Sequence, residues 1–345
     1  MRDKILRIID ANVNRATEGL RVAEDIVRFV LDDHGLTSKL KHVRHEISRL
    51  LRDERWETCL PAGEVRGARN VKTDVGAKRS TKSEVRRKDI LDVFLANIKR
   101  AEESVRVFEE TSKLFEPKLG PKFKKIRFEL YDIEQKASIL LKKKIKLDSP
   151  LYIITDNSYG YSHLHIMKEA AKAGARIFQL RDKGLGARDL ERTAKTMSNY
   201  AKAHELTFIV NDHLDIAKKV DADGVHVGIR NWTVGIRNWQ RQGKIVGISA
   251  SNMKEALKAQ SLGADYIGFG PVFKTPVKPN AKPTGIKELR RVTERVMIPI
   301  VAIGGINRSN IAQIKAAGCD QAAVIRAVAG AKDIIKATRG LIKTI

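Results

Sequence analysis

The sequence predicts two domains: an all-helical domain over residues 1–145 and a (βα)8 barrel, the TIM-barrel fold, over residues 149–345. Three observations lead to this prediction. The chain has 345 residues, more than a single hydrophobic core usually supports. Its first half has helical periodicity and an internal repeat, and its second half alternates short apolar strands with amphipathic helices. The expected fold class is α/β, with an all-α domain in front of the barrel.

The helical domain is expected to be a duplicated helical hairpin. The segment Ala11–Asp25 recurs as Ala96–Glu110, and Leu40–Ile47 recurs as Phe123–Leu130. Two hairpins packed about a pseudo-twofold axis are the simplest explanation of such a repeat. The oligomeric state is left open, and a homo-oligomer is one alternative.

A polar stripe runs through both copies of the repeat. In each copy Asn, Arg, Glu, Arg and Glu recur at every third residue, which keeps neighbours adjacent on a helix. The stripe comprises Asn12, Arg15, Glu18, Arg21 and Glu24, then Asn97, Arg100, Glu103, Arg106 and Glu109. A ladder of surface ion pairs and a symmetric polar site both explain this pattern. Between the copies lies the basic loop Arg66–Gly76, whose composition suits a phosphate with a magnesium ion and equally a solvated loop.

After a linker at Leu140–Pro150, short apolar strands alternate with helices eight times. Helices are expected at Ala187–Ala203, Asn252–Leu262 and Ile286–Val296, among others. The predicted strands are Leu151–Asp156, Ala175–Lys183, Thr207–Asp212, Gly224–Gly228, Lys244–Ser249, Asp265–Val272, Pro299–Gly305 and Gln321–Ala327. Fully apolar parallel strands in eight βα units favour a closed barrel, whose active site lies at the carboxyl ends of the strands.

The end of the second predicted strand carries the strongest functional signal. Gln179, Arg181 and Lys183 alternate along it, so an extended strand would project all three side chains to one face. Two cations on one face repel each other unless a polyanionic ligand lies between them. This strand end therefore predicts a phosphate-type site, with a solvated strand end as the alternative.

Other strand ends add compatible chemistry. Asn211 and Asp212 offer the hard oxygen atoms that magnesium prefers. Ser249 ends the fifth strand, and Thr275 and Lys278 follow the sixth. Backbone amides at Gly304–Gly305, followed by a helix, form the usual phosphate cradle of late barrel strands.

Taken together, these motifs resemble the thiamine-phosphate synthase family. Gln-Leu-Arg-Asp-Lys, Val-Asn-Asp, Ala-Asp-Gly-Val-His-Val-Gly, Gly-Ile-Ser-Ala, Asp-Tyr-Ile-Gly-Phe-Gly-Pro-Val-Phe and Pro-Ile-Val-Ala-Ile-Gly-Gly-Ile occur in family order over about residues 150–330. The family joins hydroxymethylpyrimidine diphosphate to hydroxyethylthiazole phosphate and releases pyrophosphate. The resemblance implies a magnesium-assisted dissociative displacement in this chain.

The resemblance also implies roles for individual residues. Gln179 would contact the pyrimidine, and Asp212 would ligate Mg²⁺. The diphosphate would be bound by Arg181, Lys183, Asn211, Ser249 and Lys278, of which Lys183, Ser249 and Lys278 are the expected catalytic residues. The thiazole phosphate would be bound by Thr275, Gly305, Ile325 and Arg326.

Three departures from the family pattern stand out. Asn231 occupies the position of a second magnesium carboxylate, so metal affinity should be weaker, and Val227–Trp232 repeats beside it as Val234–Trp239. Val277 replaces one of two paired threonines. Arg326 replaces a common serine and adds a cation beside the expected phosphate site.

The segment Asp10–Asp25 resembles a helical domain that is fused to some of these synthases. Related domains are associated with phosphorylating hydroxymethylpyrimidine phosphate, which implies ATP as a substrate. The chain has no Gly-x-x-x-x-Gly-Lys loop, so the kinase role follows from the resemblance alone, and a structural or dimerising domain is the alternative.

Two other functions remain as alternatives for the whole chain. A thiazole tautomerase of the same fold would carry a histidine two residues after the fifth-strand serine, where this chain has Ser251. The net charge of +25 is compatible with a basic nucleic-acid-binding protein. The positive charge is spread along the chain and aromatic residues make up only 6%, so anionic small substrates are favoured over nucleic acid.

The composition of the chain also predicts where in the cell the protein is found. No run approaches the ~18 apolar residues of a membrane span, and the N-terminus lacks a signal-peptide pattern. Cys59 and Cys319 have no ligand-type neighbours, so neither a disulfide framework nor a metal centre is expected. These features predict a cytoplasmic protein without a membrane partner.

Overall fold

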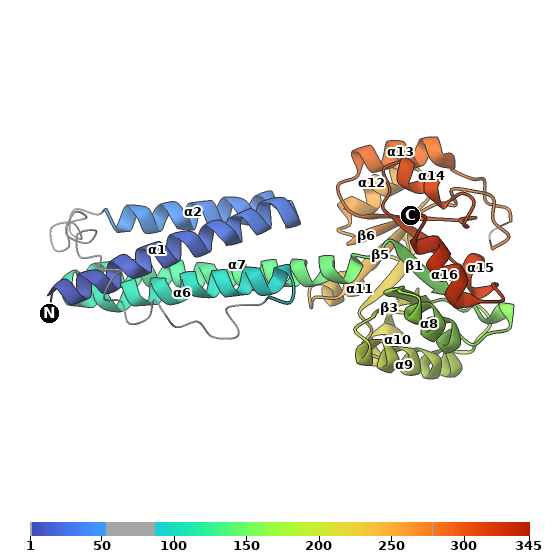
Figure 1. Cartoon of the computed structure of the whole chain (residues 1–345), viewed down its shortest axis with the longest axis horizontal. Coiled ribbons are helices and arrows are strands. Elements are labelled where there is room, and N and C mark those ends of the chain that lie inside the picture. The colour runs from blue at the N-terminus through green and yellow to red at the C-terminus, as the bar shows by residue number, and fades with distance from the viewer. Residues whose placement is uncertain (1, 53–86, 278) are drawn as a thin grey trace. The chain divides into compact units, whose positions relative to one another are not determined.

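The computed structural model describes residues 2–52, 87–277 and 279–345. The chain divides into two compact units, Met1–Lys144 and Ile145–Ile345. The first unit is helical and the second is a closed barrel, so the predicted fold class is confirmed (Figure 1). In the described part of the chain no helix has both the length and the apolar character needed to cross a membrane.

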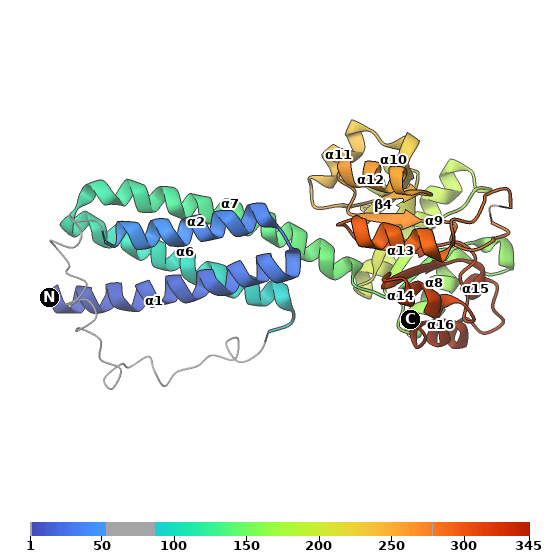
Figure 2. The ribbon, with the colours of Figure 1, turned by 90° about the horizontal axis from the view of Figure 1, so that it is seen from above.

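Two helical hairpins form the first unit, and their helices lie side by side in both views (Figures 1 and 2). A π-helical turn, Val27–Leu31, leads from α1 into α2, which Asp33 caps by accepting a hydrogen bond from the Leu36 amide. A 3-10 turn at Pro117–Leu119 joins α6 to α7. The α-helices in the described part of this unit are α1 (Arg2–Ile26), α2 (His34–Leu50), α6 (Ile90–Phe115) and α7 (Gly120–Leu147).

The repeat in the sequence is a repeat in the structure. The first repeated block lies in α1 and α6, and the second lies in α2 and α7. Their buried faces match position by position: Leu36, Leu40, Val43, Ile47 and Leu50 correspond to Leu119, Phe123, Ile126, Leu130 and Ile133. At the contact of α1 with α6, a Cβ on Gly19 would lie 2.5 Å from the carbonyl oxygen of Asn97, so the close approach requires glycine. The predicted duplicated hairpin is therefore confirmed.

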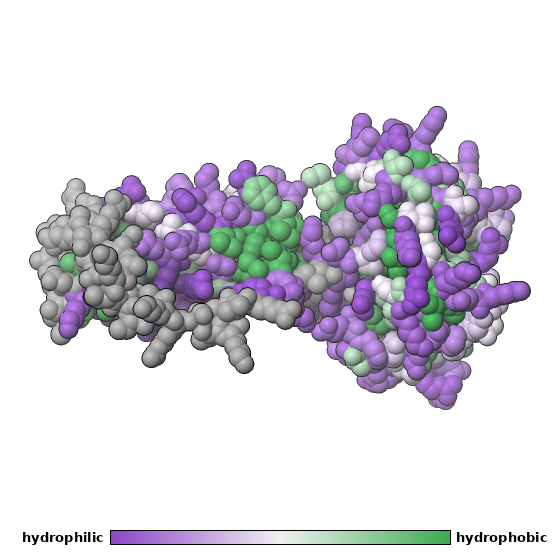
Figure 3. All heavy atoms as spheres, viewed as in Figure 1, coloured by the Kyte–Doolittle hydropathy of each residue, from purple (hydrophilic) through white to green (hydrophobic). Residues whose placement is uncertain are grey.

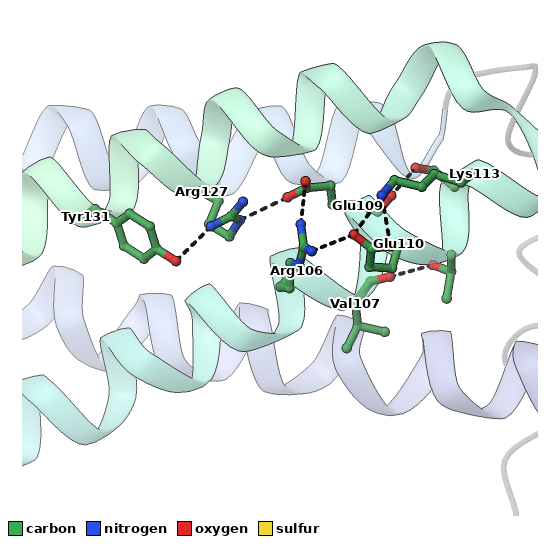
Figure 4. A network of polar contacts seen from close by, with 9 residues as sticks. Arg106, Val107, Glu109, Glu110, Lys113, Arg127 and Tyr131 are labelled. Carbon is green, nitrogen blue, oxygen red and sulfur yellow. Dashed lines mark hydrogen bonds and ion pairs between the residues drawn. The ribbon is translucent and has the colours of Figure 1, made fainter.

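Part of the polar stripe stabilises these hairpins. Glu24 accepts from Nε of Arg44 at 3.1 Å, and the equivalent Glu109 accepts from Nε of Arg127 at 2.9 Å. Figure 4 shows the second pair, in which Arg106 also contacts Glu109 at 2.6 Å. The last carboxylate of each stripe thus joins the two helices of its own hairpin.

The remaining members of the stripe divide into two groups. Asn12 and Asn97 each donate to a carbonyl oxygen four residues earlier in their own helix. The exposed members are Arg15, Glu18, Arg21, Arg100, Glu103 and Arg106. The ion pairs at the end of the stripe agree with the first interpretation, whereas its middle faces solvent and the symmetric polar site stays a prediction.

One carboxyl group in this unit is costly to bury. Glu102 has 4% of its surface exposed, and its pKa is raised to about 7 by burial, an effect that Lys99 at 3.0 Å only partly offsets and nearby Glu134 reinforces. Among the described residues its Oε1 atom has no hydrogen-bond partner. Between about pH 4.5 and pH 7, Glu102 is therefore protonated in the native state and ionised in the unfolded chain. The free energy of unfolding falls as the pH rises through this range.

Replacing Glu102 by glutamine should raise the stability of the helical unit at pH 8 and change it little at pH 4.5. The expected gain at pH 8 is at most about 3 kcal/mol, since one pKa unit corresponds to about 1.4 kcal/mol. Calorimetric melting of wild type and Glu102→Gln at the two pH values measures it. An equal shift at both pH values would show that the charge of Glu102 is not the cause.

The second unit is an eight-stranded parallel barrel in strand order β1 to β8, closed by pairing of β1 with β8. All eight strands overlap the predicted ranges, but β2, β6 and β8 each end three residues earlier than the sequence predicted. The strands are β1 (Leu151–Thr155), β2 (Ile177–Leu180), β3 (Thr207–Asn211), β4 (Gly224–Gly228), β5 (Ile245–Ala250), β6 (Tyr266–Phe269), β7 (Ile300–Ile303) and β8 (Gln321–Val324). The helices of this unit are α8 (His163–Lys172), α9 (Ala187–Ala203), α10 (Leu214–Lys219), α11 (Val234–Gln240), α12 (Met253–Ser261), α13 (Gly285–Arg295), α14 (Ile311–Ala316), α15 (Arg326–Ala329) and α16 (Ile334–Ile342).

Alternation along the strands fills the barrel interior. The inner cluster comprises Leu147, Tyr152, Ile154, Ile177, Ile209, Ile245, Tyr266, Val301 and Ala323, which come from seven strands and the end of α7. Outward-facing residues of the same strands pack against the surrounding helices in a separate, larger cluster. In the view of Figure 3 hydrophilic residues cover most of both units, with an apolar area on the helical unit. Because the strands are parallel and side chains fill the barrel interior, the polar residues at the carboxyl ends of the strands lie together at one end of the barrel.

Candidate active site

A cavity of about 170 Å³ opens at the carboxyl ends of the barrel strands. Its lining contains eight of the residues that the sequence suggested: Gln179, Arg181, Asn211, Ser249, Thr275, Gly305, Ile325 and Arg326. They come from β2, β3, β5 and the segments after β6, β7 and β8, so the fold brings together positions up to 147 residues apart in the sequence. Lys278 lies outside the described residues, and so does the loop Arg66–Gly76.

The β2 strand ends earlier than the sequence indicated. It stops at Leu180, whereas the apolar alternation predicted a strand up to Lys183. Gln179 is 2% exposed and lines the cavity together with Arg181. Lys183 is exposed and is absent from the described lining, because side chains alternate only as far as the strand continues. The expectation that all three side chains share one face is therefore wrong for Lys183.

A buried chain of hydrogen bonds crosses the floor of the cavity from Gln179 to Ser249. Nε2 of Gln179 donates to the Tyr152 hydroxyl at 2.9 Å, and that hydroxyl lies 2.8 Å from the hydroxyl of Tyr266. The Tyr266 hydroxyl lies 3.0 Å from Nδ1 of His226, whose Nε2 lies 2.9 Å from Oγ of Ser249. We call these five residues the polar relay. It links two predicted ligand-binding residues on different strands.

Burial keeps the two tyrosines of the polar relay protonated. It raises the pKa of both Tyr152 and Tyr266, so each keeps its one hydroxyl proton at neutral pH. The Tyr152 hydroxyl accepts from Gln179, and each tyrosine hydroxyl has one proton and two acceptor lone pairs to share with its neighbours in the polar relay. The polar relay therefore connects a carboxamide, two hydroxyls, an imidazole and a serine hydroxyl without a carboxylate.

Sequence reasoning missed three members of the relay, Tyr152, His226 and Tyr266. Two glycines inside the barrel, Gly247 and Gly268, indicate the positions of His226 and Tyr266. A Cβ on Gly247 would lie 2.2 Å from Cζ of Tyr266 and 2.5 Å from Nδ1 of His226, and one on Gly268 would lie 2.8 Å from Cε1 of His226. Glycines on two neighbouring strands therefore make space for the two rings, a pattern that becomes readable only once the strand register is known.

The two residues suggested as metal ligands lie together after β3 and β4, where Asp212 contacts Asn211 of the cavity lining, although neither Asp212 nor Asn231 occurs in the described lining. Asp212 is exposed and has φ +62°. Its carboxylate accepts from Nδ2 of Asn211 at 2.7 Å and from Nδ2 of Asn231 at 3.4 Å. No group of three or more His, Cys, Asp or Glu suited to a metal occurs among the described residues. The site thus offers one carboxylate flanked by two carboxamides.

The opposite part of the cavity is built from backbone. Gly304 and Gly305 have φ of +103° and +67°, and a Cβ on either would lie 2.4 Å from backbone atoms of Pro271 or Lys274. Glycine is therefore required here by both conformation and space. The Ile325–Arg326 segment begins the short helix α15 beside this turn. An anion in this part would meet peptide groups and the Arg326 guanidinium.

Ser251, the residue at issue for a tautomerase, has a structural role. Its amide and its hydroxyl both donate to Glu255 at 2.8 Å, at the start of α12. It is absent from the described lining of the cavity. The position therefore provides no acid or base for a tautomerisation.

Two family models match the chain. Residues 151–328 match the model described as thiamine monophosphate synthase, and residues 7–136 match the ThiD2 family. A thiamine-phosphate synthase from Synechocystis sp. is 34% identical over 341 residues, covering 98% of this chain and 95% of the relative. Another from Nostoc punctiforme is 33% identical over 342 residues, covering 99% of this chain and 94% of the relative.

A solved structure agrees with these matches. Thiamine phosphate pyrophosphorylase from Pyrococcus furiosus is 38% identical with a TM-score of 0.52, covering 56% of this chain and 94% of its own. The resemblance drawn from the strand-end motifs is thereby confirmed, and the tautomerase and nucleic-acid alternatives are not favoured. The chain belongs to the thiamine-phosphate synthase family.

Proposed function

We propose that the barrel, residues 149–345, joins 4-amino-2-methyl-5-hydroxymethylpyrimidine diphosphate to hydroxyethylthiazole phosphate, giving thiamine phosphate and pyrophosphate. The cavity carries this proposal. Arg181 follows β2, whereas Gly304–Gly305 and Arg326 follow β7 and β8, and all of them line one cavity together with the polar relay. Two anion-attracting regions in a cavity whose described lining holds no carboxylate suit two phosphorylated rings.

The reaction requires neutralisation of the negative charge on the departing pyrophosphate and positioning of the thiazole nitrogen. The bond between the pyrimidine methylene carbon and the diphosphate oxygen breaks, and its electron pair leaves with pyrophosphate. The thiazole nitrogen then shares its lone pair with that carbon and becomes the cationic nitrogen of the product. No proton moves in either step, so the reaction requires no protein nucleophile and no general base.

The polar relay fits this substrate pair at both ends. Oε1 of Gln179 would accept from the pyrimidine amino group, and the Ser249 hydroxyl would donate to a diphosphate oxygen. Arg181 and Asn211 would bind the same diphosphate, and Lys183 and Lys278 would add charge as pyrophosphate departs. Thr275, Gly305, Ile325 and Arg326 would hold the thiazole phosphate.

Asp212 and Asn231 fit a magnesium ion. Mg²⁺ is commonly held by one or two carboxylates together with substrate phosphates and water, and Asp212 supplies one carboxylate. Asn231 would contribute its amide oxygen in place of the nitrogen that now faces Asp212. Bound there, Mg²⁺ would neutralise charge that develops on the diphosphate.

Replacing Asn231 by aspartate should lower the magnesium concentration that gives half-maximal turnover. A charged oxygen then replaces the amide nitrogen that lies 3.4 Å from the Asp212 carboxylate, and two adjacent carboxylates favour a cation between them. A magnesium titration of wild type and variant measures the shift, with Arg230→Asp as a control for added negative charge in the same turn. Equal shifts in both variants would contradict direct ligation by residue 231.

We further propose that the helical domain, residues 1–145, makes the diphosphate from hydroxymethylpyrimidine phosphate and ATP. The proposal rests on the ThiD2 match and on the exposed arginines of the stripe. Purified full-length protein should convert the monophosphate, ATP and thiazole phosphate to thiamine phosphate. Arg21→Ala should impair this conversion and spare the reaction from supplied diphosphate. Product only from supplied diphosphate would contradict the kinase role and leave the domain as a scaffold.

A further inference from the structure

We propose that His163 is a positioning residue for the diphosphate site, because it anchors the segment Arg181–Lys183, here called the β2 tip. The inference rests on the proposed synthase function, since the β2 tip is assigned there to the diphosphate. His163 is the first residue of α8 and does not occur in the described lining of the cavity, and nothing in its sequence surroundings marks it as functional.

The His163 ring joins β1 to the β2 tip. The residue is 3% exposed. Its Nε2 lies 2.9 Å from Oδ2 of Asp182, and its Nδ1 lies 2.8 Å from Oγ1 of Thr155, the last residue of β1. Thr155 in turn donates to the carbonyl oxygen of Gln179 at 3.2 Å. One buried imidazole thus contacts both the end of β1 and the β2 tip.

Asp182 is the centre of the β2 tip and is fully engaged. Its side chain is 4% exposed, and Oδ1 accepts from the amides of Gly184 at 2.7 Å and Leu185 at 2.9 Å. Burial alone would raise the pKa of Asp182, but the hydrogen bonds from His163 and these amides outweigh burial and lower it. The group is therefore a carboxylate at neutral pH, and a buried carboxylate is held firmly by its donors.

The contact between Asp182 and His163 holds the chain just beyond the point where the backbone pairing of β2 ends. Pairing of β2 with its neighbours stops at Leu180, one residue before Arg181. The side chain of Asp182 contacts His163 on α8, whereas Arg181, the preceding residue, lines the cavity. Neither His163 nor Asp182 occurs in the described lining, so both would act through Arg181. Small displacements of a charged group from its reacting position cost large factors in rate.

Two substitutions separate the two bonds of the ring. Asparagine places its amide near the position of Nδ1, so His163→Asn retains the contact with Thr155 and loses Asp182. Glutamine reaches the position of Nε2, so His163→Gln retains a donor to Asp182. His165→Asn is the matched control, because His165 is exposed on the same helix and stacks on Tyr161.

The experiment is steady-state kinetics of the full-length variants with each substrate varied. His163→Asn should raise the KM for the pyrimidine diphosphate about 10- to 100-fold, the usual effect of losing a hydrogen bond to a charged group, and leave the KM for the thiazole phosphate within about twofold. His163→Gln should restore most of the affinity, and His165→Asn should match wild type. Adding His163→Asn to Asp182→Asn should cause little further loss, because both remove the same bond.

A structural role alone would give different results. If His163→Asn lowered only the melting temperature, or raised both KM values equally, the positioning role would be overturned. Calorimetric binding of inorganic pyrophosphate supplies a readout that needs no turnover. Weaker pyrophosphate binding by His163→Asn, in a chain that makes no thiamine phosphate, would support the anchor while contradicting the synthase function. Unchanged pyrophosphate binding in an active enzyme would overturn the anchor alone.

Discussion

Replacing Asp212 by alanine should lower synthase turnover by about 1000-fold or more while the barrel stays folded. Asp212 is the carboxylate of the proposed magnesium site, and a metal ion that stabilises a departing diphosphate contributes several kcal/mol to the transition state. Its side chain is exposed and bonded to two flanking amides, so its removal leaves the core intact. Turnover at saturating magnesium and a thermal melt measure the two effects.

A second variant separates charge from backbone strain. Asp212 has φ +62°, a conformation that alanine adopts with strain and asparagine accepts readily. Asp212→Asn should therefore fold as well as wild type and still lose turnover. Asp215→Ala is the control, because Asp215 is an exposed carboxylate in the first turn of α10. Near-normal turnover in Asp212→Asn would contradict the assignment of Asp212 to the metal.

Replacing Gly247 by alanine should destabilise the barrel and impair turnover together. The new methyl group would lie 2.2 Å from Cζ of Tyr266 and 2.5 Å from Nδ1 of His226, distances at which one of the rings has to move. Overpacking of this kind costs about 1–3 kcal/mol. Movement of either ring breaks the polar relay, and movement of His226 also takes away its contact with the Ser249 hydroxyl. Calorimetry and steady-state kinetics measure the two losses.

Gly186→Ala is the matched control for this substitution. No atom lies within 4 Å of the Cβ that it would add, and Gly186 has φ −67°, so alanine fits there. Its melting temperature and turnover should stay close to wild type. If Gly247→Ala behaved like Gly186→Ala, the packing of His226 and Tyr266 in the barrel interior would be wrong.

The barrel was predictable because its signals are local and repeated. Each strand is a short apolar run, and each is followed by polar or glycine residues where the chain leaves the sheet. The end of each strand was less predictable. β2 ends at Leu180, and two residues later Asp182 contacts His163 on α8, an interaction between residues 19 apart that the periodicity of the sequence does not reveal.

The polar relay illustrates what strand patterns leave out. Tyr152 and Tyr266 look like ordinary apolar-face residues in the sequence, and they meet only when the barrel closes. Their register depends on all the intervening strands. Gly247 and Gly268 leave room for the rings of His226 and Tyr266. Because the two glycines lie on neighbouring strands, their shared role can be recognised only in the folded structure.

The repeated segment Val-Gly-Ile-Arg-Asn-Trp shows how context decides local structure. Its first copy ends β4 and forms the 3-10 turn Ile229–Asn231, whereas its second copy, Val234–Trp239, lies in α11. Pairing with β5 holds the first copy extended. Thr233 starts the helix of the second copy by accepting from the amide of Ile236. Identical sequences thus take different structures, and propensity alone would have assigned both alike.

The most direct test of the account is product formation by the purified full-length chain. Incubation with hydroxymethylpyrimidine diphosphate, hydroxyethylthiazole phosphate and Mg²⁺ should yield thiamine phosphate and pyrophosphate in equal amounts, measured by chromatography and mass spectrometry. Arg181→Ala should give far less of both products, and a chelator should suppress them. Failure of the folded wild-type protein to form thiamine phosphate under these conditions would contradict the proposed synthase function.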